Sequence, residues 1–506
     1  MAETASPAPT ARTLAELKES GWQSRPIKEE LRANLRRKIQ ANETAFPGIL
    51  GYEDSVLPQI ESALLARHNI LLLGLRGQAK TRIARAMVNL LDEWMPIVAG
   101  SALQDDPFQP ISYYGRTLLA EKGDDTPIEW VHRSARYAEK LATPDVTVAD
   151  LIGDIDPIKA AAEKLSYSDE RVLHFGIIPR ANRGIFVINE LPDLQARIQV
   201  ALFNILQEGD IQIRGFKLRL QPDIQFVFTA NPEDYTNRGS IVTPLKDRIE
   251  SQILTHYPRS LEVALKITQQ EARIPEAQRD RIHVPELMKN LVEQVAVEAR
   301  ESEFVDPKSG VSARLSISAY EQLLSATERR LLYSGEDQGT ARVADLYSII
   351  PAITGKVELV YEGEQEGAQN VAHSMISKAI RSQFELLFPN PEKKKRQKDK
   401  ENPYQKILDW FNGDKEVDIL RDTDQKTYEK QLNNVKGLKK FVERYVTDLP
   451  KAEQPVMMEF VLHGLAEFSQ LSKHQLETGI SFKDLMGGLF GKIRLEDDDY
   501  DLDDDD

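Results

Sequence analysis

The sequence contains no cysteine. This absence excludes disulfide bonds, thiolate metal sites and cysteine nucleophiles. No apolar run approaches the roughly 18 residues that a membrane-spanning helix needs. The first residues, 1–7, have neither the basic start nor the apolar core of a signal peptide. We therefore expect a cytoplasmic protein without a membrane span.

Charge is distributed unevenly along the chain. The net charge is −15, but the last eleven residues carry nine acidic side chains and no basic one, so the rest has a net charge of −6. This acidic end has two interpretations: a solvated, disordered tail that aids solubility, or a docking tail for a basic partner. Outside one basic run at 393–400 no basic face is evident, so we expect no binding to nucleic acid.

Hydrophobic patterning predicts an α/β domain followed by helices. Short unbroken apolar runs at 70–73, 185–188 and 226–228 alternate with helical patterns, as in a parallel sheet buried on both faces. The expected organisation is a disordered tail and amphipathic helix (1–44), the α/β domain (45–258) with a polar, irregular insertion (about 101–172), a helical domain (259–390), a basic linker (391–402), a further helical segment (403–492) and an acidic tail (493–506).

The strongest local signal is a glycine-containing loop between a predicted strand and a predicted helix. It reads Gly-Leu-Arg-Gly-Gln-Ala-Lys-Thr over residues 74–81, the pattern of a phosphate-binding P-loop. Lys80 would neutralise phosphate oxygens, and the Thr81 hydroxyl would help to hold Mg²⁺. Ala79 stands where glycine is usual, and we expect its φ to be negative because a side chain disfavours positive φ. The cofactor-binding residues predicted in this segment are Gly74, Arg76, Gly77, Gln78, Ala79, Lys80, Thr81 and Arg82.

Polar residues follow the next two apolar strands. Asn189 and Glu190 end the run 185–188, at the sheet edge where open α/β sheets bind ligands. Glu190 is placed to orient or deprotonate a water molecule, while Asn189 offers a neutral oxygen to Mg²⁺ in a position usually held by Asp. Asn231 follows the strand around 226–228 and is suited to hold the attacking water.

Two arginines complete the set of candidate catalytic residues. Arg248 follows Asp247, and a guanidinium there could stabilise charge on the γ-phosphate bound by a neighbouring subunit. Taken alone, this pair favours an ordinary surface ion pair over a catalytic role. Arg314 lies at a predicted helix start, after Ser312, whose side chain suits a cap. It offers a second phosphate contact.

In this order and spacing, the motifs resemble the AAA+ ATPases of the MoxR and magnesium-chelatase ATPase-subunit family over residues 45–385. The resemblance implies a P-loop AAA+ core with a parallel sheet, β-hairpin insertions and a helical lid, to which this chain adds a C-terminal helical segment. It makes Lys80 and Thr81 the Walker A pair, Asn189 and Glu190 the Walker B end, Asn231 sensor 1, Arg248 the arginine finger and Arg314 sensor 2. It also implies that Leu50 and Gly51, within the segment 49–52, bind the cofactor near its adenine ring. Hairpins are expected at 211–220, before sensor 1, and near 151–154.

The resemblance also implies ATP and Mg²⁺ as cofactors, a homo-oligomeric ring, commonly a hexamer, and a partner with a von Willebrand factor A domain. The function expected is an ATPase that remodels or assembles a partner, with metal insertion as one form of that activity. The alternative is a nucleotide-gated assembly module that binds ATP and hydrolyses it negligibly. A transcriptional activator would need a DNA-binding module, and no helix-turn-helix pattern is evident.

Overall fold

The computed structural model describes residues 6–166, 169–213, 219–232, 240–394, 402–412, 415–476 and 479–485. The chain forms two compact units, Met1–Tyr257 and Pro258–Asp506. The acidic tail, most of the basic run at 393–400 and the tip of the hairpin expected at 211–220 lie outside the described residues. None of the described helices is long and apolar enough to cross a membrane.

The first unit is built on a five-stranded parallel sheet in the order β11-β1-β10-β7-β4. Alternate residues of its central strands face two separate hydrophobic clusters: Leu71 and Phe186 contribute to one, Leu72 and Val187 to the other. Burial on both faces explains why these strands are unbroken apolar runs. The strands are Ile70–Leu73 (β1), Tyr137–Leu141 (β4), Gly184–Asn189 (β7), Ile224–Ala230 (β10) and Ser251–Leu254 (β11).

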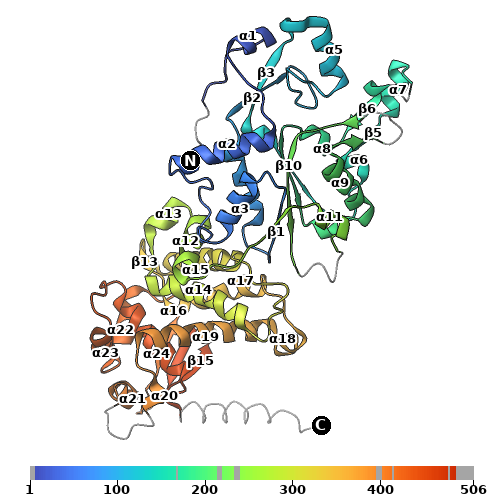
Figure 1. Ribbon diagram of the computed structural model, residues 1–506. Coiled ribbons are helices and arrows are strands. Elements are labelled where there is room, and N and C mark those ends of the chain that lie inside the picture. Colours follow the sequence, from blue (N-terminus) through green and yellow to red (C-terminus); the bar gives the residue numbers. More distant parts are fainter. Residues whose placement is uncertain are drawn as a thin grey trace. The chain divides into compact units, whose positions relative to one another are not determined.

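Helices cover both faces of this sheet (Figure 1). One cluster contains side chains of α2 (Ile27–Gln40), α3 (Val56–Leu65) and α4 (Lys80–Ala86), and the other contains those of α8 (Ile177–Arg180), α9 (Ala196–Glu208) and α11 (Thr243–Asp247). The amphipathic helix expected near the N-terminus is thus α2, and it belongs to the core. A buried ion pair, Glu30 with Arg136, ties it to the chain just before β4, with two nitrogen–oxygen distances of 2.7 Å.

Two sequence-based expectations for this unit were wrong. Residues 101–172 are not wholly irregular, because they contain β4 at one edge of the central sheet and β3 (Ile128–His132), which pairs with β2 (Trp94–Val98). Both strands carry polar residues, which hid them from a search for apolar runs. The segment 6–13 is not disordered either: the indole nitrogens of Trp94 and Trp130 donate to carbonyls within it, at 3.0 and 2.9 Å.

Both expected hairpins are present. β5 (Gly153–Ile155) pairs antiparallel with β6 (Leu173–Phe175), and β8 (Ile211–Gln212) pairs antiparallel with β9 (Arg219–Leu220). The predicted fold class, an α/β AAA+ core with a parallel sheet and hairpin insertions, is confirmed.

The second unit is mainly helical and has one continuous hydrophobic core, whose members run from Ala272 to Phe482. Its long helices are α14 (Glu286–Glu301), α15 (Arg314–Ser334), α19 (Ala368–Leu387) and α24 (Gln454–Glu467). The segment beyond residue 402 contributes to this same core and, besides its helices, contains a three-stranded antiparallel sheet of Val417–Leu420 (β14), Gly479–Lys483 (β16) and Ser472–Leu476 (β15). The sequence did not indicate this small sheet.

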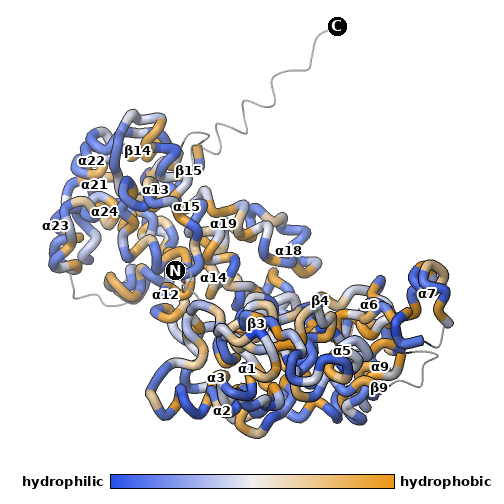
Figure 2. The backbone as a smooth tube through the Cα atoms, turned by 90° about the horizontal axis from the view of Figure 1, so that it is seen from above, coloured by the Kyte–Doolittle hydropathy of each residue, from blue (hydrophilic) through white to orange (hydrophobic). Residues whose placement is uncertain are grey.

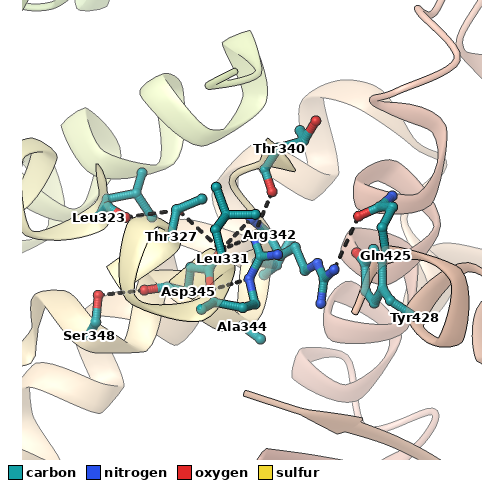
Figure 3. A network of polar contacts seen from close by, with 12 residues as sticks. Leu323, Thr327, Leu331, Thr340, Arg342, Ala344, Asp345, Ser348, Gln425 and Tyr428 are labelled. Carbon is teal, nitrogen blue, oxygen red and sulfur yellow. Dashed lines mark hydrogen bonds and ion pairs between the residues drawn. The ribbon is translucent and has the colours of Figure 1, made fainter. Parts of the chain in front are cut away.

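A network of buried polar and charged groups joins the part of the second unit before residue 402 to the part after it (Figure 3). Arg342 donates to the carbonyl of Thr423 at 2.8 Å and to Gln425 at 3.1 Å, and its guanidinium lies 4.0 Å from the ring centroid of Tyr428. These three partners all belong to the segment beyond residue 402. The segment is therefore packed into the unit as one of its structural parts.

Candidate nucleotide site

The three central strands bring the sequence motifs to one edge of the sheet. Leu73 of β1 is paired with Ala230 of β10, and Phe228 of β10 with Ile188 of β7. Since the strands are parallel, the residues that follow them emerge side by side at the carboxyl edge. The P-loop, the Asn189–Glu190 pair and Asn231 are thereby gathered, as their positions in the sequence led us to expect.

The P-loop connects β1 to the first turn of α4. The Lys80 side chain is buried, and its ammonium donates to the carbonyls of Gly74 and, at 3.1 Å, Leu75. Peptide carbonyls are neutral acceptors, so anionic phosphate oxygens would be stronger partners for this group. The loop and the helix start thus provide the donors and the cation that a phosphate chain requires.

Ala79 contradicts the expectation that its φ would be negative. It precedes α4 with φ 57° and ψ 14°, in the left-handed region. This conformation costs a residue with a side chain about 1–2 kcal/mol. The cost is offset at least in part by packing, because Ala79 lies against the hydrophobic cluster under α2, α3 and α4. The turn into the helix therefore determines the backbone here, and the methyl group is accommodated.

Behind the P-loop, Asn189 joins two strands and the first turn of α4. Its side-chain oxygen accepts hydrogen bonds from the hydroxyls of Thr81 at 3.2 Å and Thr229 at 3.3 Å. The Thr229 hydroxyl also accepts from the peptide nitrogen of Glu190 at 3.1 Å. Glu190 itself has φ 54°, so the backbone turns sharply as it leaves β7.

Thr229 was missed as a site residue by the sequence argument. Its signal was present: a hydroxyl side chain stands near the end of an otherwise apolar strand, where it is only 1% exposed. A buried hydroxyl needs a hydrogen-bonding partner, and the sheet edge supplies two.

The segment around Leu50 and Gly51 is connected to the P-loop through Tyr52. The Tyr52 hydroxyl lies 3.0 Å from the carbonyl of Gln78 and 2.7 Å from that of His256. Burial raises the pKa of Tyr52 to about 12, so its hydroxyl stays a donor at neutral pH. Leu50 and Gly51 thus lie in the chain directly before a P-loop contact, while their predicted adenine contact stays a prediction.

The Gln78 side chain and the end of β11 fix the P-loop from the other side. The Gln78 side-chain oxygen accepts a hydrogen bond from the Thr255 hydroxyl at 2.7 Å. The Tyr257 hydroxyl donates to the carbonyl of Arg76 at 3.3 Å. A Cβ atom on Gly74 would lie 1.9 Å from the Thr255 hydroxyl oxygen. This close packing explains why glycine stands at position 74.

The remaining candidates are placed as follows. Asn231 is 2% exposed directly after β10. Arg82 is exposed on α4. Arg248 forms an ion pair with Asp247 of its own chain, keeps 40% of its side chain exposed and lies 5.6 Å from the Phe203 ring. Its role toward a neighbouring subunit stays a prediction.

Arg314 belongs to the second unit and is the first residue of α15. Its peptide nitrogen donates to the Ser312 hydroxyl at 3.1 Å. The residue in the N-cap position is Ala313, so Ser312 supports the helix start from one residue farther out than expected. The sensor role of Arg314 stays a prediction.

Among the described residues no group of three or more His, Asp or Glu side chains is arranged to hold a metal ion. Thr81 and Asn189 offer oxygens that could bind Mg²⁺ together with phosphate, and their role as metal ligands stays a prediction. Such sparse protein ligation is usual for Mg²⁺ at phosphate sites.

Comparisons with known proteins agree with this geometry. The model of the AAA domain (dynein-related subfamily) matches residues 128–249, which include Asn189, Glu190, Asn231 and Arg248 but not the P-loop. The magnesium-chelatase 38 kDa subunit of Cereibacter sphaeroides is 26% identical over 234 residues, covering 44% of this chain and 61% of that subunit. The magnesium-chelatase subunit ChlI of Euglena gracilis is 23% identical over 327 residues, covering 60% of this chain and 87% of that subunit.

Solved structures resemble the chain more weakly. A complex of two magnesium-chelatase subunits, BchI and BchD, aligns at 17% identity over 63% of this chain and 98% of the other, with a TM-score of 0.33. The ATP complex of NtrX from Brucella abortus aligns at 15% identity over 58% and 53%, with a TM-score of 0.34. Both TM-scores are low. The chain spans about three fifths (61%) of the length of the Cereibacter sphaeroides subunit. On the motifs, the sheet order and the sequence matches together, the chain has an AAA+ fold and is similar to the ATPase subunits of magnesium chelatase.

Proposed function

We propose that this protein is a ring-forming ATPase that couples ATP hydrolysis to the remodelling or assembly of a partner protein. The observation that carries the proposal is the hydrogen-bonded set of Thr81, Asn189, Thr229 and Glu190 behind the P-loop. It connects Thr81, which would bind Mg²⁺ beside the nucleotide, to the peptide nitrogen of Glu190, whose carboxylate would act on water. A loop with only a structural role, joining β1 to α4, would not need this set of hydrogen bonds to the ends of β7 and β10.

Each predicted residue has a distinct role in this proposal. Lys80 and the amides of the P-loop bind the phosphates, while Thr81 and Asn189 provide oxygens for Mg²⁺. Mg²⁺, when bound, neutralises part of the phosphate charge. Glu190 orients or deprotonates the attacking water, and Asn231 holds that water in place. Arg248 of a neighbouring subunit and Arg314 stabilise the charge that develops on the phosphate oxygens.

The partner and the location are proposed from resemblance. Several relatives are subunits of magnesium chelatase, by name proteins that work within a larger assembly. We extend this to a homo-oligomeric ring, a hexamer as in the family, with a von Willebrand factor A-domain partner in the cytoplasm. Placement among the MoxR proteins and an activity in metal insertion are proposed on the same resemblance.

A specific observation supports the alternative function. Asn189 places a neutral amide where a carboxylate would bind Mg²⁺ more strongly, and that amide is already engaged by two hydroxyls. A protein with this site could bind ATP, assemble and hydrolyse it negligibly, as a nucleotide-gated module.

The test is steady-state ATP hydrolysis with Mg²⁺ at a series of protein concentrations. Glu190→Gln is expected to lower turnover by about 100-fold or more while ATP affinity stays within about threefold, since the amide keeps the shape and loses the base. Glu121→Gln, a surface change of the same chemistry, should leave turnover unchanged. Turnover that rises more than linearly with protein concentration would support a site shared between subunits. Binding of ATP without turnover in wild type would favour the alternative.

A further inference from the structure

A surface pocket with a volume of about 510 Å³ lies between the N-terminal segment and β3, and its residues take no part in the nucleotide site. Its walls include Pro9, Ala11, Glu16, Glu19, Trp22 and Trp130. Glu16 and Glu19 belong to α1 (Leu14–Glu19), which lies beside β3 in both views (Figure 1 and Figure 2). Two indole rings and two carboxylates therefore surround one cavity.

The pocket is held together by specific contacts. The Trp130 indole nitrogen donates to the carbonyl of Ala11 at 2.9 Å, which fixes the ring against the N-terminal segment. The Trp22 ring meets Trp130 edge to face, with centroids 5.4 Å apart and planes at 87°. Below them, Leu14 and Leu17 pack with Ile128 in a small hydrophobic cluster. The two rings are thus set at right angles on a packed base.

The charge of the pocket is negative. One oxygen of Glu16 accepts from the peptide nitrogen of Arg12 at 2.6 Å, and both Glu16 and Glu19 are exposed at the rim. Within the described part of the chain, the Glu19 carboxylate has no hydrogen bond or ion pair. The nearest lysine in sequence, Lys18, is paired with Asp124. The Trp22 indole nitrogen is buried and has no acceptor among the described residues.

We propose that this pocket binds an arginine or lysine side chain of a protein partner. Tryptophan faces attract cations through their quadrupole, and nearby carboxylates add a direct charge attraction. The open rim at Pro9, Thr10 and Ser20 suits a side chain that arrives attached to a larger chain. The pocket would thus be a docking point for a partner, whichever protein the ATPase acts on.

The experiment uses the full chain labelled with 5-fluorotryptophan, whose four tryptophans give separate ¹⁹F signals. The probe is the capped tripeptide Gly-Arg-Gly, and its citrulline counterpart is the neutral control. The arginine peptide should shift the signals of Trp22 and Trp130 saturably, and citrulline should not. Glu19→Gln is expected to weaken binding about threefold to fivefold, and Trp130→Phe more strongly, because phenylalanine keeps a ring with a weaker cation attraction.

Matched variants separate this proposal from the proposed function. Glu121→Gln changes a nearby surface charge outside the pocket and should leave binding unchanged. Glu190→Gln should also leave it unchanged, so binding can succeed even if hydrolysis fails. Equal binding of the arginine and citrulline peptides, or no saturable shift at millimolar peptide, would overturn the proposal. Tighter binding of tetramethylammonium than of the arginine peptide would also overturn it, in favour of a small-molecule cation site.

Discussion

The nucleotide site of the first unit and the charge network of the second unit use polar groups in opposite ways. At the sheet edge, Lys80 donates to two peptide carbonyls, and Asn189 accepts from two hydroxyls. In the second unit, Arg330 and Asp345 form a buried ion pair at 3.0 Å. Neutral partners can be exchanged for a stronger charged ligand at modest cost, whereas buried ion pairs cannot be separated without a large penalty.

Glu459 shows most clearly how the buried charged groups of the second unit hold the chain together. It is fully buried, and its two oxygens accept from the peptide nitrogens of Val343 at 3.0 Å and Ala344 at 2.8 Å. The Tyr428 hydroxyl donates to the same carboxylate at 2.6 Å. A side chain from the segment beyond residue 402 therefore caps the start of α16 (Val343–Leu346) in the earlier part of the unit. The polar groups of the first region are placed for a ligand, and those of the second hold the chain together.

The largest effect that would expose this difference is expected from Glu459→Ala. Removing one member of a buried charged network should lower the free energy of unfolding of the second unit by about 3–5 kcal/mol. Urea unfolding, followed by hydrogen exchange in peptides containing α16 and α24, measures it. Glu301→Ala, an exposed glutamate at the end of α14, should change the free energy by less than about 0.5 kcal/mol. A small effect at Glu459 would mean that the network does not hold the unit together.

Lys80→Ala should do the reverse of Glu459→Ala: it should weaken ATP binding and leave the free energy of unfolding nearly unchanged. Losing the charge-assisted contact with phosphate is expected to weaken ATP binding by about 10-fold to 100-fold, equivalent to roughly 1.4–2.7 kcal/mol. The free energy of unfolding without nucleotide should change by less than about 1 kcal/mol, because the carbonyls of Gly74 and Leu75 can turn to water instead. Titration with a fluorescent ATP analogue and urea unfolding give the two values. Loss of stability as large as that of Glu459→Ala would remove the contrast between the regions.

The same contrast explains how far the sequence could predict this molecule. The three central sheet strands, β1, β7 and β10, and the site motifs were predictable because each is local: an apolar run, a loop with glycines, or a polar residue after a strand. Thr81 and Asn189 were both assigned to Mg²⁺ from the sequence, but the hydrogen bond between them was found only in the structure.

The second region was not predictable in this way. Arg342 contacts Gln425 and Tyr428 across more than 80 positions of sequence, and no local pattern shows that these residues meet. The polar strands β4 and β15 escaped for a related reason, since their side chains do not alternate clearly. The sign of φ at Ala79 was wrong because the turn into α4, rather than the side chain, sets it.

Arg342→Lys tests whether the shape of the cation matters in the second region. Lysine keeps the charge but loses the planar guanidinium that stacks on Tyr428 and reaches both Thr423 and Gln425. The expected loss in the free energy of unfolding is about 1–2 kcal/mol. ATP affinity should stay unchanged, which the nucleotide titration checks. A loss of zero would show that charge alone is sufficient there.

The smallest expected effect concerns Ala79, where the site itself carries strain. Glycine adopts φ 57° without a steric penalty, but it also gives the unfolded chain more freedom and loses the methyl contact with the core. These terms nearly cancel, so Ala79→Gly should change the free energy of unfolding by no more than about 1 kcal/mol. Because the backbone already has the conformation that a P-loop glycine would adopt, ATP affinity should change by less than about threefold. Tighter binding by an order of magnitude would instead mean that the alanine methyl group hinders the phosphates.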